Sequence, residues 1–229
     1  MITENIQSVR SRIADACRSA GTSPDALCLV AVTKTIDTDR INEALGAGIT
    51  DVGENRVQEL VEKVGQLVPR PTFHLIGHLQ TNKVKSAVQY ADLIHSVDSL
   101  HLAEEIQKQA YAMNKKMQVL LQVNTSGEES KFGVSPDGVF ALTEGILKLP
   151  NIQVRGLMTI APKTDSVEET RPIFEKTRLL YERLSDTYFK SAPLDLLSMG
   201  MSNDFVQAIL EGATVVRVGR GIFGERIYH

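Results

Sequence analysis

Residues 27–34 read L-C-L-V-A-V-T-K, and the interpretation of the whole chain starts from this stretch. The residues from Leu27 to Thr33 are all apolar or β-branched, which is typical of a strand buried on both faces in a parallel sheet. The stretch ends in Lys34. Because active sites of α/β proteins lie at the carboxyl ends of their strands, Lys34 is either a chemically used amine or simply the first solvated residue after the strand.

The composition excludes several protein classes. The chain has 229 residues, 42% of them hydrophobic and 23% charged, and a formal net charge of −3, which provides no basic field for nucleic acid. The N-terminus lacks an apolar signal core, and no apolar run approaches the ~20 residues of a membrane helix. Cys17 and Cys28 form neither a disulfide framework nor a metal-ligand spacing. We therefore expect one cytoplasmic domain over residues 1–229, without metal, nucleic acid or membrane partners.

Strand-like and helix-like segments alternate along the chain. The predicted strands are Leu27–Thr33, Ile49–Val52, Phe73–Ile76, Leu93–Val97, Gln118–Val123, Val154–Met158, Leu194–Ser198 and Thr214–Val218. Four predicted helices are Ile2–Ala20, Arg56–Leu67, Val84–Tyr90 and Phe205–Glu211. The others are a helix capped by Asp37 or Thr38 that runs to Ala47, one capped by Asp98 or Ser99 that runs to about Met113, one capped by Ser135 that reaches Leu149, and one opened by Ser166 that runs to about Tyr188.

This alternation predicts a parallel sheet of the α/β class. Eight such units in about 200 residues indicate a closed (β/α)8 TIM barrel, here with an extra N-terminal helix. A doubly wound open sheet is the alternative. It usually has fewer strands and a glycine-rich turn after the first strand, where this chain has Thr33, Lys34 and Thr35.

Polar side chains gather directly after the predicted strands. In a (β/α)8 barrel these positions converge on one mouth, so they form the candidate site, although loops also carry polar residues because they are solvated. The positions are Lys34, Glu54, Asn55, His78, Gln80, Asn82, Lys83, Ser96, Asp98, Asn124, Ser126, Met158, Ser198, Met199, Ser202, Gly219, Arg220 and Gly221.

The loops after the last two predicted strands carry the more specific pattern. Residues 215–224 read V-V-R-V-G-R-G-I-F-G, and glycines let backbone N–H groups approach an anion closely. Residues 198–204 read S-M-G-M-S-N-D and precede a predicted helix, where we expect Ser202 or Asn203 as the cap. Phosphate sites of barrels recur in these two loops, so the pattern predicts a phosphate site. The alternative is that the glycines only form turns.

Arg217 lies inside the last predicted strand, where its guanidinium needs a partner because it stays charged. It forms either an ion pair with a barrel carboxylate or a contact to a ligand in the barrel mouth. A lysine, a phosphate site and an inward arginine together predict pyridoxal 5'-phosphate, bound covalently as an aldimine of Lys34. Its phosphate would lie on backbone N–H groups around Ser202, Gly219 and Arg220.

The histidines do not predict a metal site. His74 and His78 have the i, i+4 spacing of a helical metal pair, but the sequence H-L-I-G-H contains a predicted strand and a glycine turn. It also lacks the glutamate of a zincin motif. We expect structural roles for His95 and His101.

Segments along nearly the whole chain resemble those of the YggS/PLPBP family of pyridoxal phosphate homeostasis proteins. They include A-V-T-K-T, G-E-N-R-V-Q-E, H-L-I-G-H-L-Q-T-N-K, L-S-M-G-M-S-N-D and V-R-V-G-R-G-I-F-G. This family is similar to the barrel domain of alanine racemase, a fold-type III pyridoxal phosphate protein. The resemblance implies that Lys34 carries the cofactor, that Ser202, Gly219 and Arg220 bind its phosphate, and that Arg217 faces the pyridine nitrogen. It also implies a ring pocket lined by Asn55, His78, Ser198 and Met199.

An arginine at the pyridine nitrogen keeps that nitrogen unprotonated and weakens the ring as an electron sink. Racemases of this fold obtain a catalytic tyrosine from a separate C-terminal domain. This chain ends at His229, soon after the last predicted strand, so we expect no such domain and do not assign Tyr228 that role.

The expected function is therefore binding of pyridoxal phosphate in intracellular vitamin B6 homeostasis and amino-acid and keto-acid balance, with no catalytic residues. The expected partners are pyridoxal phosphate and pyridoxal phosphate-dependent apo-enzymes, and the expected state is a monomer or weak dimer. A racemase-like enzyme acting on small amino acids is the first alternative. A phosphosugar-binding barrel without covalent chemistry is the second.

Overall fold

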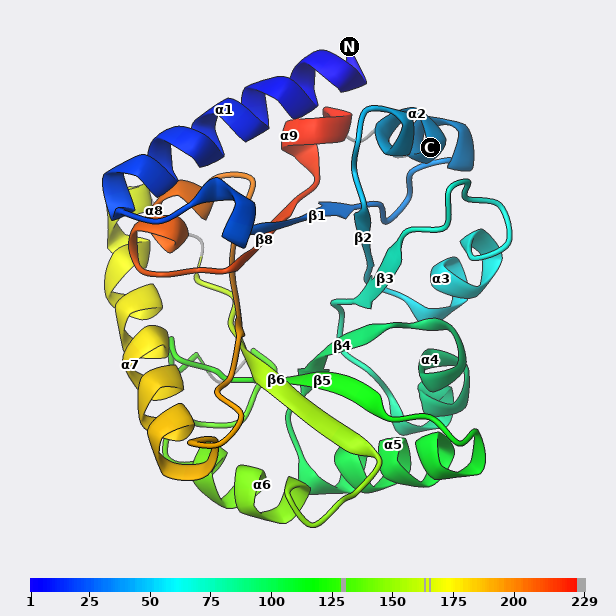
Figure 1. The fold of residues 1–229 in the computed structure, drawn as a ribbon, viewed down its shortest axis with the longest axis vertical. Coiled ribbons are helices and arrows are strands. Elements are labelled where there is room, and N and C mark those ends of the chain that lie inside the picture. Colours follow the sequence, from blue (N-terminus) through cyan, green and yellow to red (C-terminus); the bar gives the residue numbers. More distant parts are fainter. Residues whose placement is uncertain (129–130, 163, 165, 226–229) are drawn as a thin grey trace.

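The computed structural model describes residues 1–128, 131–162, 164 and 166–225, so Tyr228 lies outside the described residues. Parallel strands close into a barrel in sequence order, β1 to β8 (Figure 1). The strands are β1 (Cys28–Val32), β2 (Asp51–Glu54), β3 (Thr72–Leu75), β4 (Leu93–Val97), β5 (Met117–Gln122), β6 (Ile152–Met158), β7 (Leu196–Met201) and β8 (Val215–Val218). The predicted (β/α)8 barrel is confirmed.

Helices surround this barrel (Figure 1). They are α1 (Ile2–Ala20), α2 (Thr38–Gly46), α3 (Val57–Lys63), α4 (Val84–Tyr90), α5 (Leu100–Ala112), α6 (Gly138–Ile146), α7 (Arg171–Tyr188), α8 (Phe205–Leu210) and α9 (Arg220–Phe223). Short 3-10 helices lie at η1 (Pro24–Ala26), η2 (Thr81–Lys83) and η3 (Val167–Thr170). None of the helices in the described ranges combines the length and the apolar composition needed to cross a membrane.

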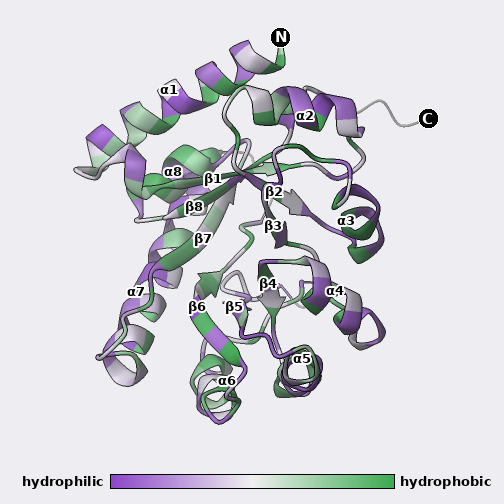
Figure 2. Ribbon diagram, turned by 45° about the vertical axis from the view of Figure 1, so that its right-hand side comes forward, coloured by the Kyte–Doolittle hydropathy of each residue, from purple (hydrophilic) through white to green (hydrophobic). Residues whose placement is uncertain are grey.

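The strands are apolar because both of their faces are covered. Every residue of β4 and of β8 is buried. Figure 2 shows the hydrophobic strands β7 and β8 lying inside helices, such as α1 and α7, that carry many hydrophilic residues. The main core is continuous through the barrel and helices, and a smaller apolar cluster of Leu93, Leu120 and Met158 joins β4, β5 and β6.

The predicted N-terminal helix has the expected bounds in α1. Its buried residues include Ile6, Val9 and Ile13, whose spacing of three and four places them on one face. Gly21 ends the helix with a left-handed backbone, φ 70°. The helix packs outside the barrel against α8 and α9 (Figure 1), so it covers the region where the last strands close onto β1.

Some predicted boundaries were wrong. The helix predicted over Arg56–Leu67 ends at Lys63, because the chain turns at Gly65, a poor helix former. Strand β7 runs to Met201, beyond the predicted end at Ser198, because a register shift lets it pair with β8 again further along. The loop predicted after β8 contains the short helix α9.

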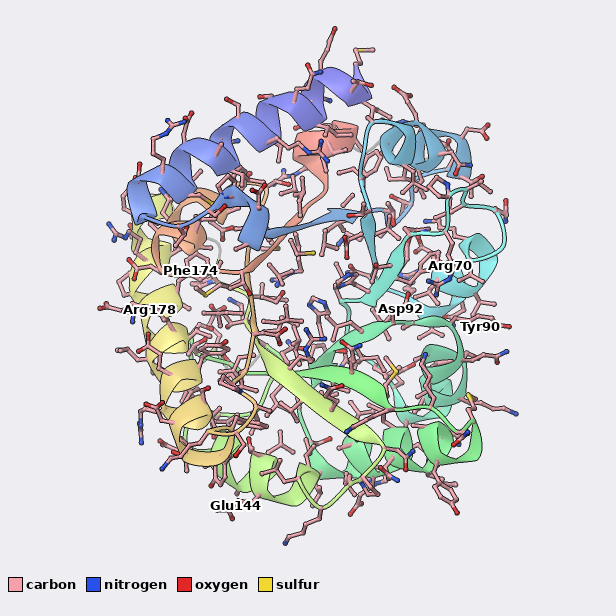
Figure 3. All side chains as sticks on the ribbon, in the orientation of Figure 1. Arg70, Tyr90, Asp92, Glu144, Phe174 and Arg178 are labelled. Atoms are coloured by element: carbon pink, nitrogen blue, oxygen red, sulfur yellow. The ribbon has the colours of Figure 1, made fainter. Side chains whose placement is uncertain are left out.

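Two ion pairs connect neighbouring strands near their amino ends. The side chains of Arg70 and Asp92, labelled in Figure 3, pair with an N···O distance of 2.9 Å. Asp92 also accepts the backbone N–H of Phe73 at 2.8 Å, which ties β3 to the segment before β4. Arg155 and Asp195 form a further pair at the start of β7. The opposite, carboxyl ends of the strands are the ends that carry the candidate site.

Candidate functional site

Lys34 lies in the turn directly after β1 and is half-buried. Strand β1 pairs with β8 in the register Val30 to Arg217, and β8 pairs in turn with β7. The segments that follow β1, β8 and β7 are therefore neighbours at one rim of the barrel. The structure thus brings Lys34 to the same rim as Gly219 and Ser202.

The turn at Lys34 is strained. The next residue, Thr35, has φ 62°, in the left-handed region that β-branched residues rarely adopt. Its backbone N–H donates to Glu59 Oε2 at 2.7 Å, so a side chain of α3 stabilises the turn. Strain of this kind is held by the surrounding structure and concentrates at functional turns.

Relief of this strain is measurable. We expect Thr35→Gly to raise the free energy of unfolding by about 0.5–1 kcal/mol, because glycine removes the left-handed penalty while adding entropy to the unfolded chain. Urea unfolding measures the change. Asn114→Gly is the matched control, since Asn114 has φ 49° but asparagine tolerates this region, and we expect no gain there. A loss of stability in Thr35→Gly would contradict the strain.

The loops after β7 and β8 meet at the Ser202 hydroxyl. Ser202 Oγ accepts the backbone N–H groups of Gly219 at 3.2 Å and of Gly221 at 3.5 Å. Arg220 is exposed beside them, and its Nη2 donates to Asn203 Oδ1 at 3.4 Å. Two N–H groups that converge on one oxygen form an arrangement that suits an anionic oxygen.

The predicted helix cap in this loop was wrong. Asp204, rather than Ser202 or Asn203, is the N-cap of α8. The Asp204 carboxylate turns back and accepts the backbone N–H of Met201 at 2.5 Å. The Ser202 hydroxyl therefore points to the loop after β8 instead of capping its own helix.

Arg217 is 3% exposed in the barrel interior. Its guanidinium donates to Ser198 Oγ at 2.5 Å and to the Thr159 carbonyl at 2.9 Å. These acceptors are neutral, and among the described residues Arg217 donates to no carboxylate, which argues against the alternative of an ion pair with a barrel carboxylate. Burial lowers the pKa of Arg217 to about 10, against the opposing charge of Asp204, and the side chain remains a cation at neutral pH.

Two buried histidines continue from Ser198. His95 Nδ1 lies 3.1 Å from Ser198 Oγ, and His95 Nε2 lies 2.9 Å from His74 Nδ1. His74 Nε2 in turn lies 2.9 Å from Asp51 Oδ1. Burial, followed by the charges of His74 and Arg217, holds the pKa of His95 well below its ordinary value, so this imidazole is neutral.

Sequence reasoning missed this chain, although it left a pattern. His74, His95, Ser198 and Arg217 are each the third residue of an observed strand, β3, β4, β7 and β8. A polar residue at the same place in four apolar strands indicates one polar layer inside a barrel.

One group in the described part of the chain has metal-ligand chemistry. Ligand atoms of Cys28, Asp51 and His74 lie within 4.8 Å of one another. The carboxylate and the imidazole already bond to each other, and burial together with Asp51 raises the pKa of the Cys28 thiol to about 12. A thiol held in its protonated form is a poor metal ligand, so we interpret the group as a hydrogen-bonded cluster. His78 is not part of it.

The predicted ring-pocket residues lie in different surroundings. Asn55 is half-buried after β2, and the chain packs so tightly there that a Cβ at Gly77 would lie 2.2 Å from its carbonyl oxygen. His78 is exposed after β3 and stacks on Phe132, with ring centroids 3.8 Å apart. Met199 is fully buried in the main core.

A buried ion pair supports the Lys34 turn, and its lysine was also missed. Glu54 Oε1 accepts the Thr33 hydroxyl at 2.6 Å and Lys63 Nζ at 2.8 Å, and Lys63 also donates to the Thr33 carbonyl at 2.8 Å. Burial raises the pKa of Glu54, against the opposing charge of Lys63. Lys63 lies on a helix, where a charged residue ordinarily indicates a solvated face, so the sequence pattern alone did not indicate it.

The chain is similar to a known protein family and to several solved structures. The family of alanine racemase N-terminal domains matches residues 2–227. A pyridoxal phosphate homeostasis protein of Aquifex aeolicus is 45% identical over 226 residues, which cover 98% of each chain. A solved structure of PipY from Synechococcus elongatus PCC7942 with PLP bound is 36% identical, with a TM-score of 0.85, and covers 98% of this chain and 100% of that one. Alanine racemase of Clostridium difficile 630 has a TM-score of 0.72 at 14% identity over 96% of this chain and 60% of its own, which is a likeness of fold.

Proposed function

The chain belongs to the family of pyridoxal phosphate homeostasis proteins and carries an alanine racemase N-terminal domain, and from this premise we propose that it binds pyridoxal 5'-phosphate at the rim formed after β1, β7 and β8. The observation that carries the proposal is the position of Lys34 on the same rim as the N–H groups that converge on Ser202. Pyridoxal phosphate has an aldehyde and a phosphate, which match a lysine and an anion site on one rim.

Each part of the site has a partner in this ligand. Lys34 would bind it covalently, because its amine, after losing a proton to solvent, can attack the aldehyde carbon. A C=N bond forms and the aldehyde oxygen leaves as water. The N–H groups of Gly219 and Gly221, with Ser202 and Arg220, would hold the phosphate.

We further propose that the protein carries the ligand rather than catalysing a reaction with it. When bound, pyridoxal phosphate supplies an electron sink, and an arginine donor at its pyridine nitrogen weakens that sink. Arg217 is a buried cation that suits this position. Pyridoxal phosphate-dependent apo-enzymes would be the receivers, and the protein would act as a monomer or weak dimer. A reducing cytoplasm is consistent with the free thiols of Cys17 and Cys28.

Covalent mapping tests the binding proposal. After the purified chain is incubated with pyridoxal phosphate and reduced with borohydride, we expect peptide mass spectrometry to find the phosphopyridoxyl group on Lys34. Lys83, which follows β3 and is also half-buried, is the internal comparison within the same experiment. A label spread evenly over both lysines, or absent, would overturn the proposed site.

Isotope exchange tests the carrier proposal. When alanine or serine is incubated with the loaded protein in D2O, we expect its α-proton to exchange no faster than it does with free pyridoxal phosphate. Sustained exchange that disappears in Lys34→Ala would show an enzyme instead, as in the racemase alternative.

A further inference from the structure

The polar layer inside the barrel is one continuous hydrogen-bonded chain. It joins Arg217, Ser198, His95, His74 and Asp51 in that order, with separations of 2.5, 3.1, 2.9 and 2.9 Å. Ser198 and His95 have no exposed surface and His74 is 4% exposed, so water does not compete for these bonds. The hydrogen bonds of Ser202 with Gly219 and Gly221 do not involve this chain.

The two ends of the chain carry opposite charges. Arg217 has only donors. At the other end burial acts to raise the pKa of Asp51, but hydrogen bonds, that of His74 first, hold it below its ordinary value, so this side chain is a carboxylate that only accepts. A chain with a pure donor at one end and a pure acceptor at the other has a preferred direction.

The neutral His95 allows one arrangement that satisfies every group. With its proton on Nε2, His95 donates to His74 Nδ1, and His74 donates from Nε2 to Asp51. Ser198 then donates its hydroxyl proton to His95 Nδ1 and accepts from Arg217. If the His95 proton were on Nδ1 instead, Ser198 would lose the acceptor for its own proton, and His74 would need a second proton to face Asp51.

We propose that His95 and His74 are positioning residues, which fix the Ser198 hydroxyl and thereby hold the Arg217 guanidinium in place for the pyridine nitrogen of the ligand. Successive hydrogen bonds polarise one another, so the carboxylate of Asp51 makes Ser198 a stronger acceptor for Arg217. This inference rests on the function proposed above.

The acidic end of the chain is accessible from outside the barrel. Asp51 is half-buried at the start of β2 and lines a cavity of about 600 Å³ with Cys28, Arg10 and Asp25, among others. The chain therefore connects this cavity, at the amino ends of β1 and β2, with the arginine that would face the ligand ring. We therefore expect a change of charge at Asp51 to alter the strength of the Ser198–Arg217 hydrogen bond, although Asp51 and Arg217 are joined only through the chain.

The first test uses the full chain without ligand. Nitrogen-15 NMR of the histidine rings reports which nitrogen carries the proton, and we expect Nε2 for both His74 and His95. An asparagine at position 51 can present either its carbonyl or its amide to His74, so in Asp51→Asn we expect His95 protonated on Nδ1 to appear. Asp195→Asn is the matched control, because Asp195 lies just before β7 and pairs with Arg155, and neither residue belongs to the hydrogen-bonded chain. We expect parental tautomers there.

The second test measures ligand affinity in the same variants. We expect pyridoxal phosphate to bind at least about threefold more weakly to Asp51→Asn and to His95→Leu than to Asp195→Asn, since each weakens one buried hydrogen bond at Arg217. His95 is fully buried, and His95→Leu could fail to fold for that reason. Because Asp51 is only half-buried, we expect Asp51→Asn to fold, and its affinity alone then decides the test.

Two outcomes would overturn the inference. One is a parent protein that lacks the two Nε2 protons, and the other is an affinity of Asp51→Asn equal to that of its control, which would make the hydrogen-bonded chain structural only. Failure of the proposed function has a different result, the absence of a covalent adduct on Lys34 in the parent. The tautomers of the ligand-free protein are measured independently of that adduct.

Discussion

Lys34→Ala is expected to lose covalent binding of pyridoxal phosphate completely. The variant has no amine to form the C=N bond, so the yellow absorption band of a lysine-bound pyridoxal, expected in the parent, should be absent. The remaining affinity would rest on the phosphate contacts of Ser202, Gly219 and Gly221. We expect it to fall roughly a hundredfold, which corresponds to about 3 kcal/mol. Absorption spectra and equilibrium titration measure both effects.

The matched control for this prediction is Lys83→Ala, which removes another half-buried lysine that follows a strand of the barrel. We expect it to keep both the band and the affinity. If Lys34→Ala kept full affinity, the phosphosugar-binding alternative without covalent chemistry would be favoured. If the parent stayed colourless with added pyridoxal phosphate, the proposed site itself would be wrong.

Lys63→Met is expected to lower the free energy of unfolding by about 3–5 kcal/mol at neutral pH, because it leaves a buried carboxylate without its cation. Glu54 is fully buried, and Lys63 is 8% exposed while its Nζ lies 2.8 Å from Glu54 Oε1. Methionine keeps most of the apolar stem of lysine, so the change tests the charge more than the packing. Urea unfolding at neutral pH measures the loss.

The pH dependence identifies the cause of this loss. In the variant the burial that raises the pKa of Glu54 is no longer opposed by Lys63. A carboxyl whose pKa is raised in the folded state binds more protons there than in the unfolded state, so stability falls as the pH rises through the folded pKa. The deficit of Lys63→Met relative to the parent is therefore expected to shrink as the pH is lowered through that pKa.

Two further variants complete the comparison. Lys63→Met combined with Glu54→Gln should recover much of the loss, since no charge then remains buried. Arg178→Met breaks the ion pair of Arg178 with Glu182, in which the two side chains are 31% and 49% exposed, and should cost less than about 1 kcal/mol. A Lys63→Met deficit that is the same at neutral and acidic pH would assign the loss to packing.

Together these variants distinguish the residue that would bind the ligand, Lys34, from the residues that stabilise the turn around it. Lys34 follows Thr33, whose hydroxyl and carbonyl are both held by the Glu54–Lys63 pair. Loss of Lys34 is expected to remove binding while leaving the fold, whereas loss of Lys63 is expected to weaken the fold beneath an intact lysine. The strained Thr35 and its bond to Glu59 belong to the same support.

Local patterns in the sequence were enough to predict the barrel. The apolar strands, the amphipathic helices and their alternation are properties of neighbouring residues, which is why α1, α4 and β4 have the predicted bounds. The same locality explains the errors. The end of β7 depends on pairing with β8, and the cap of α8 depends on where the Ser202 hydroxyl finds its donors, both of which involve residues far along the chain.

The sequence by itself therefore determined the fold class and placed Lys34, Ser202 and Gly219 in the loops at one rim, because strand ends can be recognised from periodicity. Only the tertiary structure decided the partners of the buried polar groups. His95 meets Ser198 across 103 residues of the polypeptide, and the amine of Lys63 meets Glu54 from the same buried face of α3 that carries Val57 and Leu60. The physical reason is that a buried donor or charge needs an acceptor at hydrogen-bond distance, and closure of the barrel determines which side chains are that close.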